Sequence, residues 1–130
     1  MLSGAGETIL LVEDEEDLRY MVQNVLQGYG YRVLVAENGL DALQLWQTHA
    51  RTVDLLLTDM VMPEGMTGGQ LAARLKATRA DLKVIYTSGY SVDLISQPGE
   101  ELVEGKNFVQ KPYRPQTLAE TLQRALAKTG

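Results

Sequence analysis

The stretch VDLLLT, residues 53–58, decides the fold that we expect for this chain. It is a short and almost continuous apolar run, which is typical of a strand that is covered on both faces of a parallel sheet. Similar short runs lie on either side of it in the sequence. We therefore expect five strands in all, with the other four at residues 8–12, 32–36, 84–87 and 108–109.

Amphipathic stretches alternate with these runs and predict helices. The first has apolar residues at helical spacing from Leu18 to Leu26 and ends near Gly28. Others follow Asn38-Gly39, the loop after residue 63, and Pro115, a residue type favoured in the first helical turn. Residues 93–103 are ambiguous, because Pro98-Gly99 interrupts any long helix there.

The order of elements is therefore a strand and a helix repeated five times, (βα)5. This alternation predicts an α/β fold: a doubly wound parallel sheet between two layers of helices, with right-handed crossovers. Ligands of such sheets bind outside the carboxyl ends of the strands. The residues that follow each strand are therefore the candidates for function.

Composition limits the class of protein. A chain of 130 residues is expected to form one domain, which we place at residues 7–128, with residues 1–6 as a linker or an added terminal stub. No apolar run approaches the ~18–20 residues of a membrane span, and the N-terminus does not resemble a signal peptide. The absence of cysteine excludes disulfides and thiol catalysis. The net charge of −5 argues against nucleic-acid binding, and we expect a soluble, cytoplasmic protein.

Polar residues occupy the predicted strand ends. Glu13 and Asp14 follow the first strand, and Asp59 follows the third; the fourth runs into Ser88-Gly89 and the fifth into Lys111-Pro112. Each has a structural alternative: an acidic first helical turn, a loop aspartate, a turn serine or a surface lysine. Because all of them would lie at one edge of the sheet, the group as a whole favours a functional site.

Three clustered carboxylates favour a bound cation. Two unit charges ~4 Å apart repel by about 4 kcal/mol at an effective dielectric constant of 20. Such a site raises a carboxyl pKa or recruits a metal ion, and oxygen ligands without His or Cys indicate Mg²⁺, with Mn²⁺ as a possible substitute. A carboxylate beside Mg²⁺ and an ammonium group is equipped to attack phosphorus, so these residues predict phosphoryl transfer to an aspartate.

Four motifs resemble the response-regulator receiver family of two-component signalling. They are LLVEDEE (10–16), LLLTDMVMP (55–63), VIYTSGY (84–90) and FVQKPY (108–113), in the family's order and spacing. The resemblance covers residues 7–128 and implies the flavodoxin-like strand order 2-1-3-4-5.

The resemblance also implies a role for each site residue. Asp59 would be the nucleophile that becomes the acyl phosphate, and Lys111 and Ser88 would contact the phosphoryl group. Mg²⁺ would bind to Asp14, to Asp59, to the carbonyl of Val61 and, through water, to Glu13. Ser88 and Phe108 would be switch residues, with the Phe108 ring turning inward on activation, Lys111-Pro112 would be a cis peptide, and Gly89 would leave the path of the phosphate open.

The resemblance implies partners as well. A phosphohistidine of a sensor histidine kinase or of a histidine phosphotransfer domain would be the donor. The isolated domain would be no enzyme, apart from its own phosphotransfer and autodephosphorylation. The loop after Pro63 looks one residue longer than in many regulators and the fourth helix region looks irregular; both resemble receivers of hybrid histidine kinases. A stand-alone regulator is the alternative, and we expect a monomer or a weak, phosphorylation-dependent dimer.

Other classes fit less well. A haloacid-dehalogenase-type phosphatase needs a second aspartate two residues after the nucleophile, where this chain has Val61. A flavodoxin binds phosphate with a Ser/Thr/Gly-rich loop, whereas Glu13 and Asp14 occupy that loop here. A histidine phosphotransfer domain does not fit, because the only histidine, His49, reads as a surface residue. A pseudo-receiver that acts as a phosphorylation-independent interaction module would be expected to lack part of the acidic set or the lysine.

Overall fold

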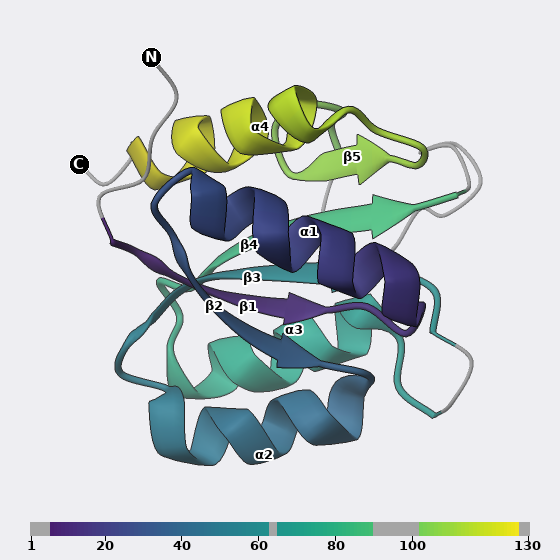
Figure 1. The fold of residues 1–130 in the computed structure, drawn as a ribbon. Helices are drawn as coiled ribbons and strands as arrows, with labels where there is room; N and C mark the ends of the chain where they lie inside the picture. Colours follow the sequence, from purple (N-terminus) through teal and green to yellow (C-terminus); the bar gives the residue numbers. More distant parts are fainter. Residues whose placement is uncertain (1–5, 63–64, 90–101, 128–130) are drawn as a thin grey trace.

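The computed structural model describes residues 6–62, 65–89 and 102–127 of the chain (Figure 1). Five strands and four helices lie in these ranges: β1 Thr8–Val12, α1 Glu16–Gly28, β2 Arg32–Ala36, α2 Gly39–His49, β3 Val53–Asp59, α3 Gly68–Thr78, β4 Lys83–Ser88, β5 Phe108–Gln110 and α4 Pro115–Ala127. Most of the region that the sequence left ambiguous, 93–103, lies outside the described residues, so a helix between β4 and β5 stays a prediction.

The strands form one parallel sheet in the order β2-β1-β3-β4-β5, as expected. Its register brings the carboxyl ends to one edge, because Val12 pairs with Thr58, Asp59 with Thr87 and Ser88 with Gln110. In Figure 1 the visible strand arrowheads point toward this edge.

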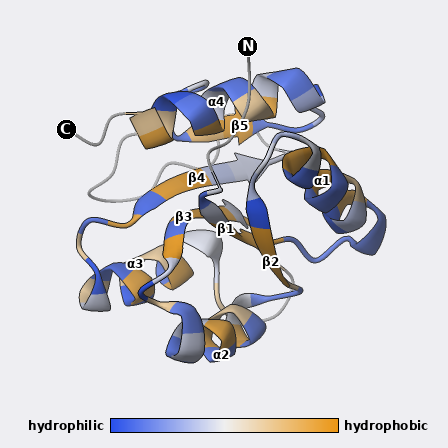
Figure 2. Ribbon diagram, turned by 60° about the vertical axis from the view of Figure 1, so that its left-hand side comes forward, coloured by the Kyte–Doolittle hydropathy of each residue, from blue (hydrophilic) through white to orange (hydrophobic). Residues whose placement is uncertain are grey.

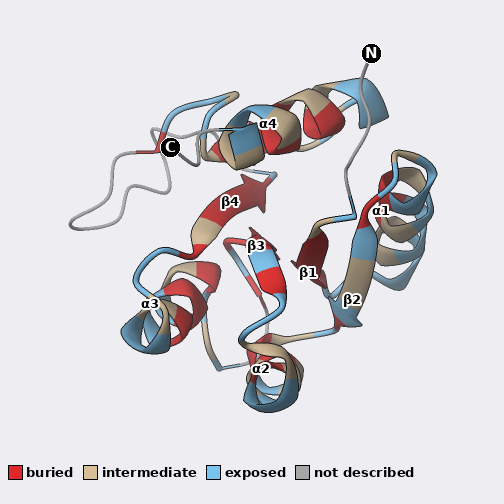
Figure 3. Ribbon diagram, turned by 90° about the vertical axis from the view of Figure 1, so that its left-hand side faces the viewer, coloured by how far each residue is buried: buried red, intermediate tan, exposed pale blue. Residues whose placement is uncertain are grey.

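Helices cover both faces of the sheet. Alternate residues of β1 point to opposite faces, as strand geometry requires: Leu10 and Val12 pack on the α2–α3 side, and Ile9 and Leu11 on the α1–α4 side. The apolar stripes and buried faces of the helices turn toward the sheet (Figures 2 and 3). Each face therefore has its own hydrophobic cluster.

Local sequence explains where α2 and α3 begin. Asn38 caps α2 by accepting the Asp41 N–H at Oδ1 (2.8 Å). Thr67 and Gln70 form a reciprocal capping box at the start of α3, with distances of 3.1 and 3.0 Å. Two caps thus fix the starts of α2 and α3 at the carboxyl edge of the sheet.

The strand ends differ slightly from the sequence expectation. β3 includes Asp59 and β4 includes Ser88, so these two residues end their strands instead of following them. The difference places both side chains on the rigid sheet, not in a loop. None of the helices within the described ranges has the length and apolar character that crossing a membrane requires.

Candidate functional site

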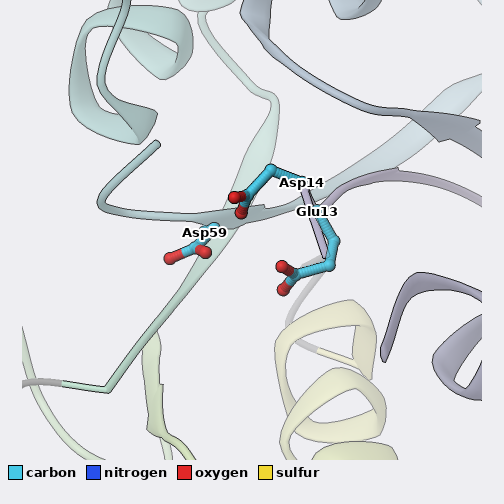
Figure 4. A group of neighbouring side chains, drawn as sticks. All are labelled: Glu13, Asp14 and Asp59. Carbon is cyan, nitrogen blue, oxygen red and sulfur yellow. The ribbon is translucent and has the colours of Figure 1, made fainter. Parts of the chain in front are cut away.

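Three carboxylates meet at the carboxyl edge of the sheet and form an acidic cluster, Glu13, Asp14 and Asp59 (Figure 4). Glu13 and Asp14 come directly after β1, and Asp59 is the last residue of β3. One oxygen from each residue lies within 4.8 Å of the others. The parallel register alone brings these distant parts of the sequence together.

Glu13 is held more tightly than its position in a loop suggests. It is 2% exposed, and its Oε2 accepts the backbone N–H of Glu15 (3.0 Å). Its own backbone N–H donates to the carbonyl of Ala36 (3.1 Å), and its carbonyl accepts from Nη1 of Arg19 (2.9 Å). The first carboxylate is therefore fixed from both neighbouring elements, β2 and α1.

Asp59 is 6% exposed and both of its carboxylate oxygens have partners. Oδ1 accepts the backbone N–H of Val61 (3.3 Å), and Oδ2 accepts from Nζ of Lys111 (3.0 Å). Lys111 Nζ also contacts Glu13 Oε1 at 2.8 Å, so one ammonium group bridges two carboxylates. Sequence reasoning did not anticipate the Glu13–Lys111 pair.

The backbone places Lys111 just beyond the end of β5. Its N–H donates to the carbonyl of Ser88 (2.7 Å), which extends the β4–β5 pairing by one residue. The Lys111-Pro112 peptide is cis, as the resemblance implied. Ser88 itself is fully buried at the end of β4, where it pairs with Gln110 of β5.

Burial and neighbouring charges shift the pKa values of Glu13, Asp59 and Lys111 in opposite directions. Burial raises the pKa of Asp59 above its ordinary value, although the hydrogen bond and charge of Lys111 oppose that rise. Burial also raises the pKa of Glu13, again against Lys111. For Lys111, burial lowers the pKa, but its contacts with Glu13 and Asp59 outweigh burial and raise it. Lys111 therefore stays charged, while Glu13 and Asp59 resist ionisation.

Other predicted residues lie around this centre. Val61 is 47% exposed and next but one to Asp59, with its N–H directed at the Asp59 carboxylate. Phe108 is fully buried in the cluster on the α2–α3 side, so its ring already points inward in this structure. A methyl group added at Gly89 would meet no atom within 4 Å, which leaves space beside Ser88. His49, read from the sequence as a surface residue, ends α2 and is partly exposed.

A cavity of about 680 Å³ opens next to Lys111. Leu18 and Met21 of α1 form part of its wall, and Pro112 and Tyr113 another part. Burial first, then the charges of Glu13 and Asp59, raise the pKa of Tyr113, so its hydroxyl stays protonated near the acidic cluster. Sequence reasoning missed Arg19 and Tyr113; the one signal for Arg19 was a lone basic residue after five acidic ones, at residues 13–17.

The donor set of this site suits a hard divalent cation. It consists of carboxylate oxygens, without His or Cys, and one ammonium group pairs with two of the three carboxylates. Mg²⁺ prefers oxygen ligands and one or two carboxylates in such sites. The residues present therefore fit the metal that the sequence predicted.

Comparisons with known proteins agree on the family. The family model of the response regulator receiver domain matches residues 9–123. The sensor kinase CckA of Brucella abortus is 37% identical over 129 residues, which are 98% of this chain and 13% of the kinase. The response regulator receiver protein CpdR of the same organism is 32% identical over 118 residues, 91% of this chain and 95% of that protein.

A solved receiver-domain structure is also similar to this chain. The crystal structure of the receiver domain from the hybrid histidine kinase CckA superposes with a TM-score of 0.76 and 33% identity, and the match covers 92% of this chain and 98% of that one. This chain thus corresponds in length to a receiver module and to a small part of the kinase that carries one.

Proposed function

This chain belongs to the response regulator receiver family, and on that premise we propose that it accepts a phosphoryl group on Asp59 in the presence of Mg²⁺. The observation that carries the proposal is the position of Asp59: a buried carboxylate at a strand end, 3.0 Å from Lys111 Nζ and clustered with two further carboxylates. A nucleophile for phosphoryl transfer needs this combination of positioning and nearby charge.

Asp59, Lys111 and Ser88 would each have a distinct role in the transfer. A carboxylate oxygen of Asp59 forms the new bond to phosphorus as the bond from phosphorus to the donor nitrogen breaks. Lys111, already bonded to Asp59, would shift toward the phosphoryl oxygens and neutralise part of their charge. Ser88 would hydrogen-bond a phosphoryl oxygen. Its burial at the end of β4 and the backbone bond from Lys111 support that role.

Asp14, Asp59, Glu13 and the carbonyl of Val61 would hold the metal. When bound, Mg²⁺ supplies positive charge next to the phosphoryl oxygens and lowers the repulsion between them and the nucleophile. Glu13 now pairs with Lys111, so the protein itself provides a counter-charge to the cluster in the absence of metal.

The donor would be a phosphohistidine of a sensor histidine kinase or of a histidine phosphotransfer domain. We propose further that the chain acts as a module of a hybrid histidine kinase, supported by its likeness to the CckA receiver. In this proposal the domain catalyses only its own phosphorylation and dephosphorylation, does not bind nucleic acid, and is a monomer or weak dimer in the cytoplasm.

The test is the mass of the intact protein after incubation with acetyl phosphate, with and without Mg²⁺. Wild type should gain one phosphoryl group only with Mg²⁺, and folded Asp59→Asn should gain none. If wild-type protein, shown to be folded, gains none under any condition, the proposal is overturned in favour of a phosphorylation-independent interaction module.

A further inference from the structure

We propose that Gly68 is a positioning residue for the Asp59 site, because only a residue without a side chain lets α3 begin directly against the peptide that follows Asp59. The inference builds on the proposed function, since it concerns how the metal ligands are held. Gly68 lies nine residues beyond Asp59 in the sequence. It has no side chain and so cannot bind the metal itself; it can act only through the backbone that it packs against.

The nearest neighbours of Gly68 are backbone atoms of Asp59 and Met60. Its N–H donates to the carbonyl of Met60 (2.9 Å). A Cβ added to Gly68 would lie 2.3 Å from the carbonyl oxygen of Asp59 and 3.0 Å from both the Asp59 carbonyl carbon and Met60 Cα. Gly68 is not among the positive-φ glycines of the described residues, so close approach, not backbone freedom, requires glycine here.

The Asp59–Met60 peptide cannot yield to such a Cβ without losing its own contacts. The N–H of Met60 donates to the carbonyl of Thr87 on β4 (2.7 Å), and the hydroxyl of Thr58 donates to the carbonyl of Asp59 (3.0 Å). Ordinary van der Waals contact starts at 3.4 Å, about 1 Å beyond the distance found. Two hydrogen bonds therefore hold the peptide where the clash would occur.

The helix on the other side is equally fixed. The capping box of Thr67 and Gln70 sets the start of α3, and Leu71 and Leu75 anchor the helix in the core with 0% exposure. Protein interiors are close-packed, so a displacement of this size is transmitted and not absorbed locally. Either α3 or the end of β3 must move.

A shift at the end of β3 would move two proposed metal ligands together. The Met60 peptide joins Asp59 to Val61, and the Val61 N–H is already bonded to Asp59 Oδ1 (3.3 Å). Glu13 and Asp14 follow β1 and would not move with them. Gly68 therefore sets the distance between the two halves of the acidic cluster, and its replacement should weaken Mg²⁺ binding.

The chain contains two matched controls for this substitution. Gly39 is the first residue of α2, as Gly68 is of α3, but the nearest atoms to its added Cβ belong to the side chain of Met66, with Sδ at 3.0 Å and Cβ at 3.2 Å. Gly28, the last residue of α1, has no atom within 4 Å of its added Cβ. Alanine at these positions tests the same change without the backbone clash.

The experiment compares Gly68→Ala with Gly39→Ala and Gly28→Ala by Mg²⁺ titration calorimetry and by urea unfolding. Residues that orient metal ligands change affinity by about 10- to 100-fold when replaced, so we expect a loss in that range for Gly68→Ala. The two controls should stay within about twofold of wild type. A destabilising core variant far from the cluster, Leu122→Ala on the buried face of α4, should keep wild-type affinity. Wild-type affinity in folded Gly68→Ala would overturn the inference, as would an equal loss in Leu122→Ala.

Two further measurements cover the remaining cases. If Gly68→Ala does not fold, the second variant is Thr58→Val, which removes the hydroxyl that donates to the Asp59 carbonyl. Weakened Mg²⁺ binding in folded Thr58→Val supports the inference, and unchanged Mg²⁺ binding in folded Thr58→Val overturns it. If wild type itself binds no Mg²⁺, the proposed function fails separately. The amide chemical shifts of Met60 and Val61 in metal-free Gly68→Ala then decide: they move if Gly68 positions this segment, and stay if it does not.

Discussion

Strand β3 carries an aspartate near each end, and the two have opposite surroundings. Asp54 is exposed, and its Oδ2 accepts the backbone N–H of Thr8 (2.8 Å), which joins the start of β3 to the start of β1. Asp59 is buried and lies among other carboxylates. The same side chain on the same strand thus supports the fold at one end and a site at the other.

The charge balance of the two ends explains the difference. At the amino end one carboxylate meets one backbone donor and remains in contact with water. At the carboxyl end three carboxylates cluster, two of them, Glu13 and Asp59, share one ammonium group, and burial disfavours the charged forms of these two. On the proposed function, this crowding of like charge would be relieved by a bound cation.

Replacing each of the two aspartates by asparagine gives the largest expected difference between the two ends of β3. Asp59→Asn should abolish phosphorylation by acetyl phosphate, whereas Asp54→Asn should keep the wild-type rate and lose less than about 1 kcal/mol of stability, because an amide oxygen still accepts the Thr8 N–H. Intact mass and urea unfolding measure the two quantities. Loss of phosphorylation in folded Asp54→Asn would contradict the view that only the carboxyl end of β3 carries the site.

Removing the ammonium group should be the next largest effect. Lys111→Met leaves Glu13 and Asp59 without their shared cation, and unpaired buried charges destabilise by about 3–5 kcal/mol. Because the Lys111 side chain is 19% exposed, we expect about 2–3 kcal/mol at neutral pH without Mg²⁺, by urea unfolding. Stability equal to wild type would show that the carboxylates do not depend on Lys111.

The raised pKa of Asp59 predicts a smaller, pH-dependent effect. A carboxyl group whose folded-state pKa lies above its unfolded-state pKa binds more protons in the folded state. The free energy of unfolding then falls as pH rises through the interval between the two values. Metal-free Asp59→Asn should therefore exceed wild type in stability at pH 7, and this advantage should shrink toward pH 4. Parallel pH profiles of the two proteins would contradict the prediction.

The smallest effect is expected at the exposed member of the cluster. Asp14→Asn removes one charge from the repelling group and should stabilise the metal-free protein by less than about 1 kcal/mol, as surface charges do. Mg²⁺ should raise the melting temperature of wild type and of Asp54→Asn, since it binds only the folded state, but raise that of Asp14→Asn less. Thermal unfolding with and without Mg²⁺ checks both parts; lowered metal-free stability in Asp14→Asn would argue against crowding.

Much of the fold was predictable because its signals are local. The run at residues 53–58 and its four counterparts give the strands, and a parallel sheet then brings Glu13, Asp59 and Lys111 to one edge without further information. The strand order was implied by the family resemblance.

What the sequence could not predict depends on contacts between distant side chains. The ion pair between Lys111 and Glu13 depends on the side-chain rotamers of both residues. The hydrogen bond from Arg19 to the Glu13 carbonyl depends on how the first turn of α1 is oriented. The partner of Asp54 lies 46 residues away, next to a register shift between Thr8 and Ile9. The need for Gly68 arises only once α3 packs against the end of β3.

The direction of the first and last described elements has a consequence for tethering. β1 starts at the amino end of the sheet, and α4 runs back to that end, where Arg124 bonds to the carbonyl of Gly105 ahead of β5 (Figure 1). Both attachment points are therefore separated from Asp59 by the length of a strand, roughly 20 Å at about 3.3 Å per residue. A phosphodonor joined at either end would need a linker long enough to pass around the sheet. A shorter linker would favour transfer between separate molecules over transfer within one.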